Sequence, residues 1–114
     1  MSGVQAAIAR QVATRQQRET ALRELRERVS MDWDELVAAR TRLENATRAS
    51  RSSQDVYESY ARQYTAGRKT WLDVMNTVRE STQSDVAVAD SRAQAMGASL
   101  RLRLLTGNLT GLPE

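Results

Sequence analysis

The sequence lacks several residue types on which common enzyme and metal sites depend. It contains no cysteine and no histidine, which excludes thiol nucleophiles, disulfide bonds, Cys/His zinc sites and an imidazole base. Phenylalanine is absent as well, and two tryptophans and three tyrosines are the whole aromatic content of 114 residues. Much of the remaining apolar content is alanine, which suits a narrow helix–helix seam better than a thick core. We therefore predict a protein that is not an enzyme, with no catalytic residue, cofactor or metal.

Residues that interrupt helices are also scarce. The one proline is Pro113, next to the end, and there are five glycines. An interior without proline that is rich in Ala, Arg, Gln, Glu and Leu favours uninterrupted helix. No run approaches the roughly 20 apolar residues of a membrane-spanning helix. Residues 1–17 have no apolar segment typical of a secretion signal, so we expect no signal sequence in this chain.

The net charge of +3 comes almost entirely from arginine. Several glutamates stand four residues before an arginine, the better orientation for an ion pair along a helix. These pairs are Glu19–Arg23, Glu24–Arg28, Glu44–Arg48 and Glu58–Arg62. Interleaved charges of both signs indicate a solvated helix surface and make a poor track for phosphates. We predict no nucleic-acid partner.

Two segments carry the seven-residue repeat of a coiled coil, and we predict helices over residues 4–64 and 71–105. In the first helix the predicted seam consists of Leu22, Val29, Leu36, Leu43, Ser50, Tyr57 and Tyr64, with Leu25, Asp32, Ala39, Ala46, Ser53 and Tyr60. In the second it consists of Leu72, Arg79, Val86, Ala93 and Leu100, with Met75, Thr82, Ala89, Met96 and Arg103.

Residues 65–70 predict a tight turn between these helices. Gly67 suits the left-handed residue that ends a helix. Thr70 can cap the next helix, and Asp73 stands where its carboxylate reaches back to the cap amide. A connection this short makes the helices antiparallel. The predicted fold is all-α: a long antiparallel coiled-coil hairpin of two unequal helices over residues 1–109, followed by an irregular tail, residues 110–114.

Folding the chain about residue 68 pairs residues whose numbers sum to about 136. This pairing places Leu36 by Leu100 and Ala39 by Met96, with large side chains facing small ones at several levels. It also places Asp32 near Arg103, where the two charges neutralise each other. Gly107 is the expected end of the second helix.

The two predicted helices differ in length by about 40 Å at 1.5 Å per residue. Residues before about Val29 therefore have no partner in the chain. Each helix also carries a second apolar stripe, Trp33 with Val37 on the first and Val74 with Val78 on the second. A two-helix hairpin needs one stripe per helix, so the second stripes predict neighbours on both sides, as in a bundle or a closed ring of helices.

The turn and the end of the second helix contain the most specific motifs in the sequence. The turn reads Tyr64-Thr-Ala-Gly67-Arg-Lys-Thr-Trp-Leu-Asp73-Val-Met, and the helix closes with Leu104-Leu105-Thr-Gly107-Asn-Leu109. Over Met1 to about Leu109 the chain resembles the C-terminal helical part of TolC-like outer-membrane channel proteins, and its Arg-Lys-Thr-Trp-Leu-Asp-Val stretch looks most like members that serve type I secretion.

The resemblance implies a role in transport. The chain would be one helical hairpin of an α-barrel, a periplasmic tunnel closed by a homotrimer. The tunnel would be a passive conduit for type I protein secretion or efflux, gated at its tip. Its partners would be a periplasmic adaptor protein and an inner-membrane transporter. Contact with the outer membrane would be made through β-strands absent from this chain, and the expected location is the outer membrane and periplasm.

The resemblance also gives roles to residues of the turn, each beside a simpler structural role. Gly67 is structural on either interpretation. Tyr64 matches a position that holds the tip closed against a neighbouring hairpin, or it continues the aromatic seam of Tyr57 and Tyr60. Lys69 matches a position where members often carry arginine in the closing ion-pair network, and it lacks the planar fork of arginine. The alternative for Lys69 is a solvated turn residue.

Three further positions near the turn complete the predicted tip. Asp73 matches an acidic ring in the lumen, where three copies would favour cations and polar cargo; its alternative role is a helix cap, and the two roles are compatible. Asn76 stands where some members carry a second acidic residue. Trp71 is an adaptor contact or a packed anchor, and Arg68 belongs to the same gate and adaptor-contact group. From the residues alone, a stand-alone coiled-coil scaffold or partner-binding hairpin remains the alternative function.

Overall fold

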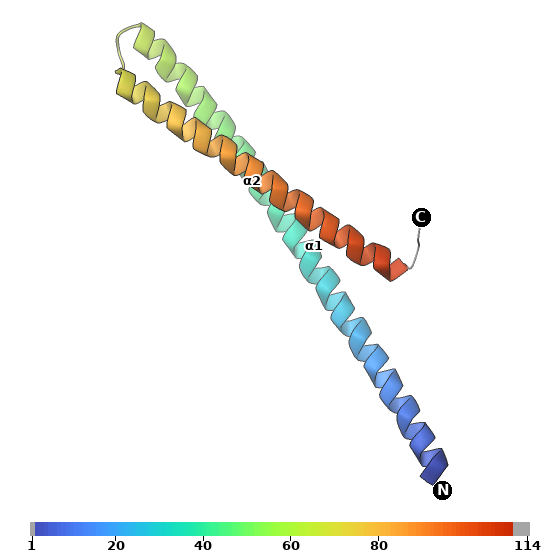
Figure 1. Ribbon diagram of the computed structural model, residues 1–114. Coiled ribbons are helices and arrows are strands. Elements are labelled where there is room, and N and C mark those ends of the chain that lie inside the picture. Colours follow the sequence, from blue (N-terminus) through green and yellow to red (C-terminus); the bar gives the residue numbers. More distant parts are fainter. Residues whose placement is uncertain (1, 111–114) are drawn as a thin grey trace.

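The computed structural model describes residues 2–110, which form two helices joined by one turn (Figure 1). Helix α1 spans Ser2–Thr65 and helix α2 spans Trp71–Thr110. They run antiparallel in a rod of 98 × 28 × 14 Å. The predicted all-α hairpin of two unequal helices is confirmed.

The ends of α2 show how local signals act here. The helix begins at Trp71, as its cap predicts, and it continues through Gly107 to Thr110 rather than ending near Leu105. Among the described glycines, only Gly67 has a positive φ, so Gly107 keeps helical geometry. Of the predicted tail, residues 111–114 lie outside the described part of the chain.

The seam predicted for α1 is confirmed by burial. Leu36 and Ala39 are buried, and Tyr64 and Leu22 at its two ends are exposed. Between these ends the half-buried seam residues are Leu25, Val29, Asp32, Leu43, Ala46, Ser50, Ser53, Tyr57 and Tyr60. The regular spacing of three and four therefore marks the face that α1 turns toward α2.

The seam predicted for α2 is wrong, because the helix turns its other stripe inward. The predicted seam residues Met96 and Leu100 are 67% and 57% exposed. The buried residues are Val74, Thr77, Ala95 and Ala98, two positions further along the repeat. Val74 belongs to the stripe that is predicted to face outward, so the inner and outer faces of α2 are exchanged relative to the prediction.

The packing of the two helices far from the turn explains why α2 turns this stripe inward. Leu36 and Ala39 form one cluster with Ala95 and Ala98, so neither the Leu36–Leu100 nor the Ala39–Met96 contact forms. Small residues at the contact allow two helix axes to approach closely. The alanines of α2 therefore lie against Leu36 and Ala39, with Leu102 packed beside them, and Met96 and Leu100 stay outside.

Polar contacts cross the middle of the seam. Ser50 donates a hydrogen bond to Asp85 at 2.8 Å, and Ser53 and Ser84 share one at 3.0 Å. Ser81 donates to the side-chain oxygen of Gln54 at 3.4 Å. These contacts match a chain folded about residue 68, so the predicted pairing level is correct even though the face of α2 is not.

The predicted ion pairs are absent from the described residues. The salt bridge recorded there joins Arg42 to Glu35 at 2.9 Å, seven positions apart. Asp32 and Arg103 do not pair, because Arg103 lies on the exposed side of α2. Within residues 2–110, neither helix is long and apolar enough to cross a membrane.

Candidate functional site at the hairpin tip

The turn is held by main-chain hydrogen bonds at the end of α1. The Gly67 N–H donates to the Tyr64 carbonyl at 2.9 Å, and the Arg68 N–H donates to the Gln63 carbonyl at 2.8 Å. This pair of bonds defines a Schellman motif, which requires a left-handed residue after the helix. Gly67 supplies it with φ of 77°, and no neighbouring atom lies within 4 Å of a Cβ built there. Backbone conformation, rather than space, favours glycine at this position.

Helix α2 begins with a reciprocal cap. The Asp73 N–H donates to the Thr70 hydroxyl at 3.2 Å, and the Thr70 N–H donates to the Asp73 carboxylate at 3.0 Å. Hydrogen bonding of the carboxylate to the main chain and then to the side chain of Thr70 lowers the pKa of Asp73 from its ordinary value, and the charge of nearby Lys69 lowers it further. Asp73 is therefore an anion at neutral pH, and one of its oxygens is already engaged by the cap.

Aromatic contacts join the two helices just inside the turn. The Tyr64 and Trp71 rings lie 5.7 Å apart with their planes tilted by 59°. The Lys69 ammonium lies 4.6 Å from the centre of the Tyr60 ring, within the range of a cation–π contact. Lys69 is thus a half-buried side chain held against α1, not a free turn residue.

The structure brings most of the predicted tip residues together. Tyr64, Lys69 and Trp71 make contacts within the tip, and Gly67 shapes the turn. Arg68 contributes its main-chain N–H, while its side chain is exposed. The arrangement is a positively charged end of the hairpin with one capping carboxylate.

Large apolar side chains remain uncovered along the outer sides of the hairpin. On α1 they include Val37 of the predicted stripe, whereas Trp33, which is also exposed, lines a groove between the two helices. On α2 they include Leu72, Val86, Met96, Leu100 and Leu104. Sequence reasoning recognised that each helix has two stripes but exchanged them on α2. The signal that would have distinguished them is the matched run of small residues, Ser84, Ser91 and Ala98 on α2 opposite Ala39 and Ser53 on α1.

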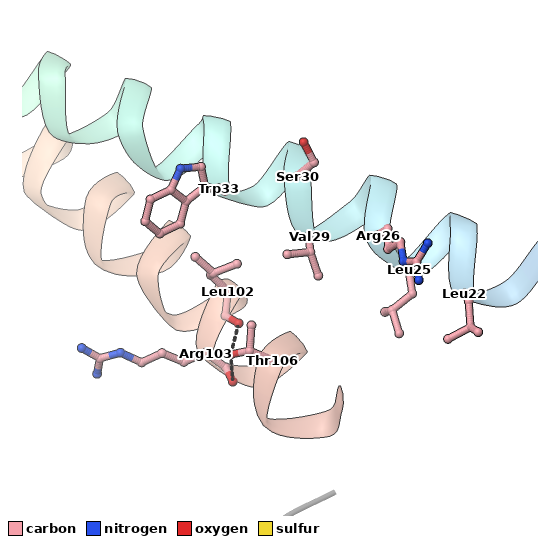
Figure 2. A pocket seen from close by; sticks show the side chains of 9 residues that line it. All are labelled: Leu22, Leu25, Arg26, Val29, Ser30, Trp33, Leu102, Arg103 and Thr106. Atoms are coloured by element: carbon pink, nitrogen blue, oxygen red, sulfur yellow. Dashed lines mark hydrogen bonds between the residues drawn. The ribbon is translucent and has the colours of Figure 1, made fainter. Parts of the chain in front are cut away.

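A groove of about 710 Å³ opens between the helices where α2 ends. Figure 2 shows Leu25, Val29 and Trp33 of α1 pointing toward Leu102 of α2 across this space. Arg103 also lines the groove, at its edge on α2. The groove continues the seam of α1 beyond the last turns of α2, so the apolar surface of α1 is longer than the helix that covers it.

A thin hairpin with apolar stripes on both sides belongs to the class of helical assembly modules. Few of its side chains are buried, and most of its large apolar residues are exposed. A family profile described as outer membrane efflux protein matches residues 1–108. The chain therefore belongs to the outer membrane efflux protein family, whose members are channels rather than enzymes, and the non-enzymatic prediction is confirmed.

Membership implies a role in efflux or secretion and suggests the outer membrane and periplasm as the location. No curated protein and no solved structure matches the chain.

Proposed function

We propose that this hairpin is one wall segment of a periplasmic tunnel formed by a trimeric outer-membrane channel. The channel passively conducts type I secretion cargo or small molecules and receives them through an adaptor protein and an inner-membrane transporter. The amino-acid sequence of the turn is most similar to that of the family members that serve type I secretion. Energy for transport comes from the inner-membrane partner.

The observation that carries the proposal is the pair of uncovered apolar stripes. Val37 on α1 and Met96 on α2 are 48% and 67% exposed. A self-sufficient scaffold hairpin would cover such side chains or replace them with polar ones. In a ring of helices each hairpin contacts two neighbours, and both outer faces are covered.

The tip supports a gate at the narrow end of this tunnel. The Tyr64–Trp71 pair and the Lys69–Tyr60 contact tie the side chains of the tip to one another. Asp73 adds a carboxylate that three subunits would repeat around the entrance, favouring cations and polar cargo. Lys69 is the proposed latch between neighbouring hairpins.

Assembly of the complete gene product that contains this hairpin tests the proposal. We expect membrane extraction and cross-linking to give a trimer, and planar bilayers to record discrete channel conductance. Met96→Glu should abolish the trimer, because a carboxylate on the outer stripe would be desolvated against an apolar neighbour. Gln94→Glu, the same charge change off the stripe, should leave the trimer intact. A discrete soluble dimer with a sharp melting transition, and no conductance, would instead establish the scaffold function.

The latch has its own test in the same bilayer recording. Lys69→Asp should raise the conductance of the closed state. The positive charge proposed to pair with a neighbouring hairpin becomes a negative charge, which the same partner repels at the constriction. Arg79→Asp makes the same charge change on the exposed surface of α2 and should not alter it. Unchanged closed-state conductance in Lys69→Asp would remove the latch role while leaving the tunnel role standing.

A further inference from the structure

Two grooves between the helices meet at Arg103. One is the groove of about 710 Å³ beside Leu102. The other, of about 530 Å³, lies nearer the turn and is lined by Leu43 and Ala95. Each volume is within the usual range of a small-molecule site. Because Arg103 lines both grooves, we describe them as one concavity and call it the lateral groove.

The lateral groove is lined by basic side chains and by no acidic one. Helix α2 contains no aspartate or glutamate between Asp90 and its end at Thr110. The salt bridge recorded among the described residues joins Arg42 to Glu35, outside the groove. Positive charge therefore gathers here without a carboxylate among the lining residues. The arginines that line the groove are Arg26, Arg40, Arg92 and Arg103.

The chemistry of the lateral groove changes along its length. Leu22, Leu25 and Val29 form an apolar wall on α1 (Figure 2). Trp33 follows them in the same wall, and Arg40 lies two turns further along the helix. At 1.5 Å per residue, the wall from Leu22 to Trp33 is about 16 Å long. The groove therefore has a long apolar end and a basic end.

The two ends of the groove favour a ligand that itself has two parts. A small inorganic anion would use only exposed guanidinium groups, and such charge pairs contribute little in water. A neutral apolar molecule would leave the basic end unused. In a molecule with an apolar tail and an anionic head, burial of the tail removes apolar surface from water, and the head accepts charge-assisted hydrogen bonds from guanidinium groups. Charge complementarity and shape together therefore fit an anionic amphiphile.

We propose that the lateral groove binds a small anionic amphiphile with a single apolar tail. The tail lies along Leu25 and Val29, and the anionic head lies between Arg40 and Arg103. These two arginines come from different helices and line the same groove, so one head group can accept hydrogen bonds from both. The inference goes beyond the tunnel role and does not depend on it.

Simple amphiphiles provide the probes for a binding experiment with the full 114-residue chain. Trp33 reports binding through its fluorescence in a Trp71→Phe background, at probe concentrations below those at which micelles form. We expect dodecanoate to bind at least about tenfold more tightly than dodecyltrimethylammonium, with the difference shrinking as salt is added. Octanoate, with its shorter tail, should bind at least about tenfold more weakly than dodecanoate, and acetate should not bind measurably.

Charge-reversed variants decide whether the two arginines hold the head group. The double variant Arg40→Glu with Arg103→Glu should bind dodecyltrimethylammonium more tightly than dodecanoate. The control Arg28→Glu with Arg51→Glu makes the same charge change at exposed positions that line neither part of the groove, and it should keep the original preference. Circular dichroism verifies that each variant remains helical.

Equal affinities for the anionic and cationic amphiphiles would overturn the proposal, as would a preference that the groove variant keeps or that the control variant also reverses. Sedimentation of the chain alone tests the competing occupant. Self-association that Leu25→Glu abolishes would show that a second copy of the chain covers the groove, which would also overturn it.

Discussion

Two substitutions that lie two residues apart can test which face of α2 lies in the seam. Ala98 is 1% exposed in the seam, and Leu100 is 57% exposed on the outer stripe. The sequence pattern alone had assigned Leu100 to the seam. With Ala98 in the seam, Ala98→Leu should destabilise the hairpin more than Leu100→Ala does. With Leu100 in the seam, the order would be the opposite.

The magnitudes follow from the contacts of each side chain. Ala98 packs in one cluster with Leu36 and Ala39, so a leucine there forces the helices apart, at a cost of about 1–3 kcal/mol. Less than half of the Leu100 side chain is covered, and complete burial of leucine contributes about 1.5–3 kcal/mol. Leu100→Ala should therefore cost no more than about 1 kcal/mol, partly offset by the higher helix propensity of alanine.

Urea denaturation followed by far-ultraviolet circular dichroism measures both changes in the free energy of unfolding. The chain is kept at a concentration at which sedimentation shows a monomer, because covering the outer stripe in an oligomer would enlarge the effect of Leu100→Ala. If Leu100→Ala destabilises the monomer by about 2–5 kcal/mol, the usual cost of truncating a buried leucine, and more than Ala98→Leu does, the reasoning on the seam is refuted.

The turn and its cap yield further predictions, read out in the same unfolding experiment. Gly67→Ala should destabilise the hairpin by about 1 kcal/mol, because alanine is strained at the positive φ of this residue. Gly97→Ala, at an open position inside α2, should instead stabilise it by about 0.5–1 kcal/mol, and equal effects of the two would contradict the role of Gly67. Thr70→Ala should cost about 1 kcal/mol through loss of the cap. The folded pKa of Asp73 is lowered, so its contribution is fully present above the ordinary value of 3.8 and is lost as pH falls through the lower folded value. Asp73→Asn should therefore destabilise the hairpin near neutral pH and have little effect in strong acid, and a loss of stability that does not vary with pH would exclude the ionised cap.

The sequence by itself determined the helices, the turn and the face of α1. A chain with five glycines and no proline before Pro113 has few places to stop a helix. The one internal break contains Gly67, which ends α1, and the cap of Thr70 and Asp73, which begins α2. Each of these signals acts through residues that are neighbours in the sequence. The pairing level followed as well, since a short turn leaves little freedom in where the two helices meet.

Local patterns do not report which tip residues touch. The cation–π contact between Lys69 and Tyr60 depends on how the turn returns the chain to α1. The splay that opens the apolar groove near Leu102 likewise depends on the path of both helices. These features arise from contacts between residues far apart in the sequence.

Only the tertiary structure decided which face of α2 lies inside. Both of its stripes repeat every seven residues, and hydrophobicity favours the one containing Met96 and Leu100. The hairpin uses the other stripe, with Ala95 and Ala98, because these small side chains let α2 approach the surface of α1 around Leu36 and Ala39 closely, with Leu102 packed beside them. Shape complementarity between two helices is a property of the pair, and the periodicity of either helix alone does not contain it.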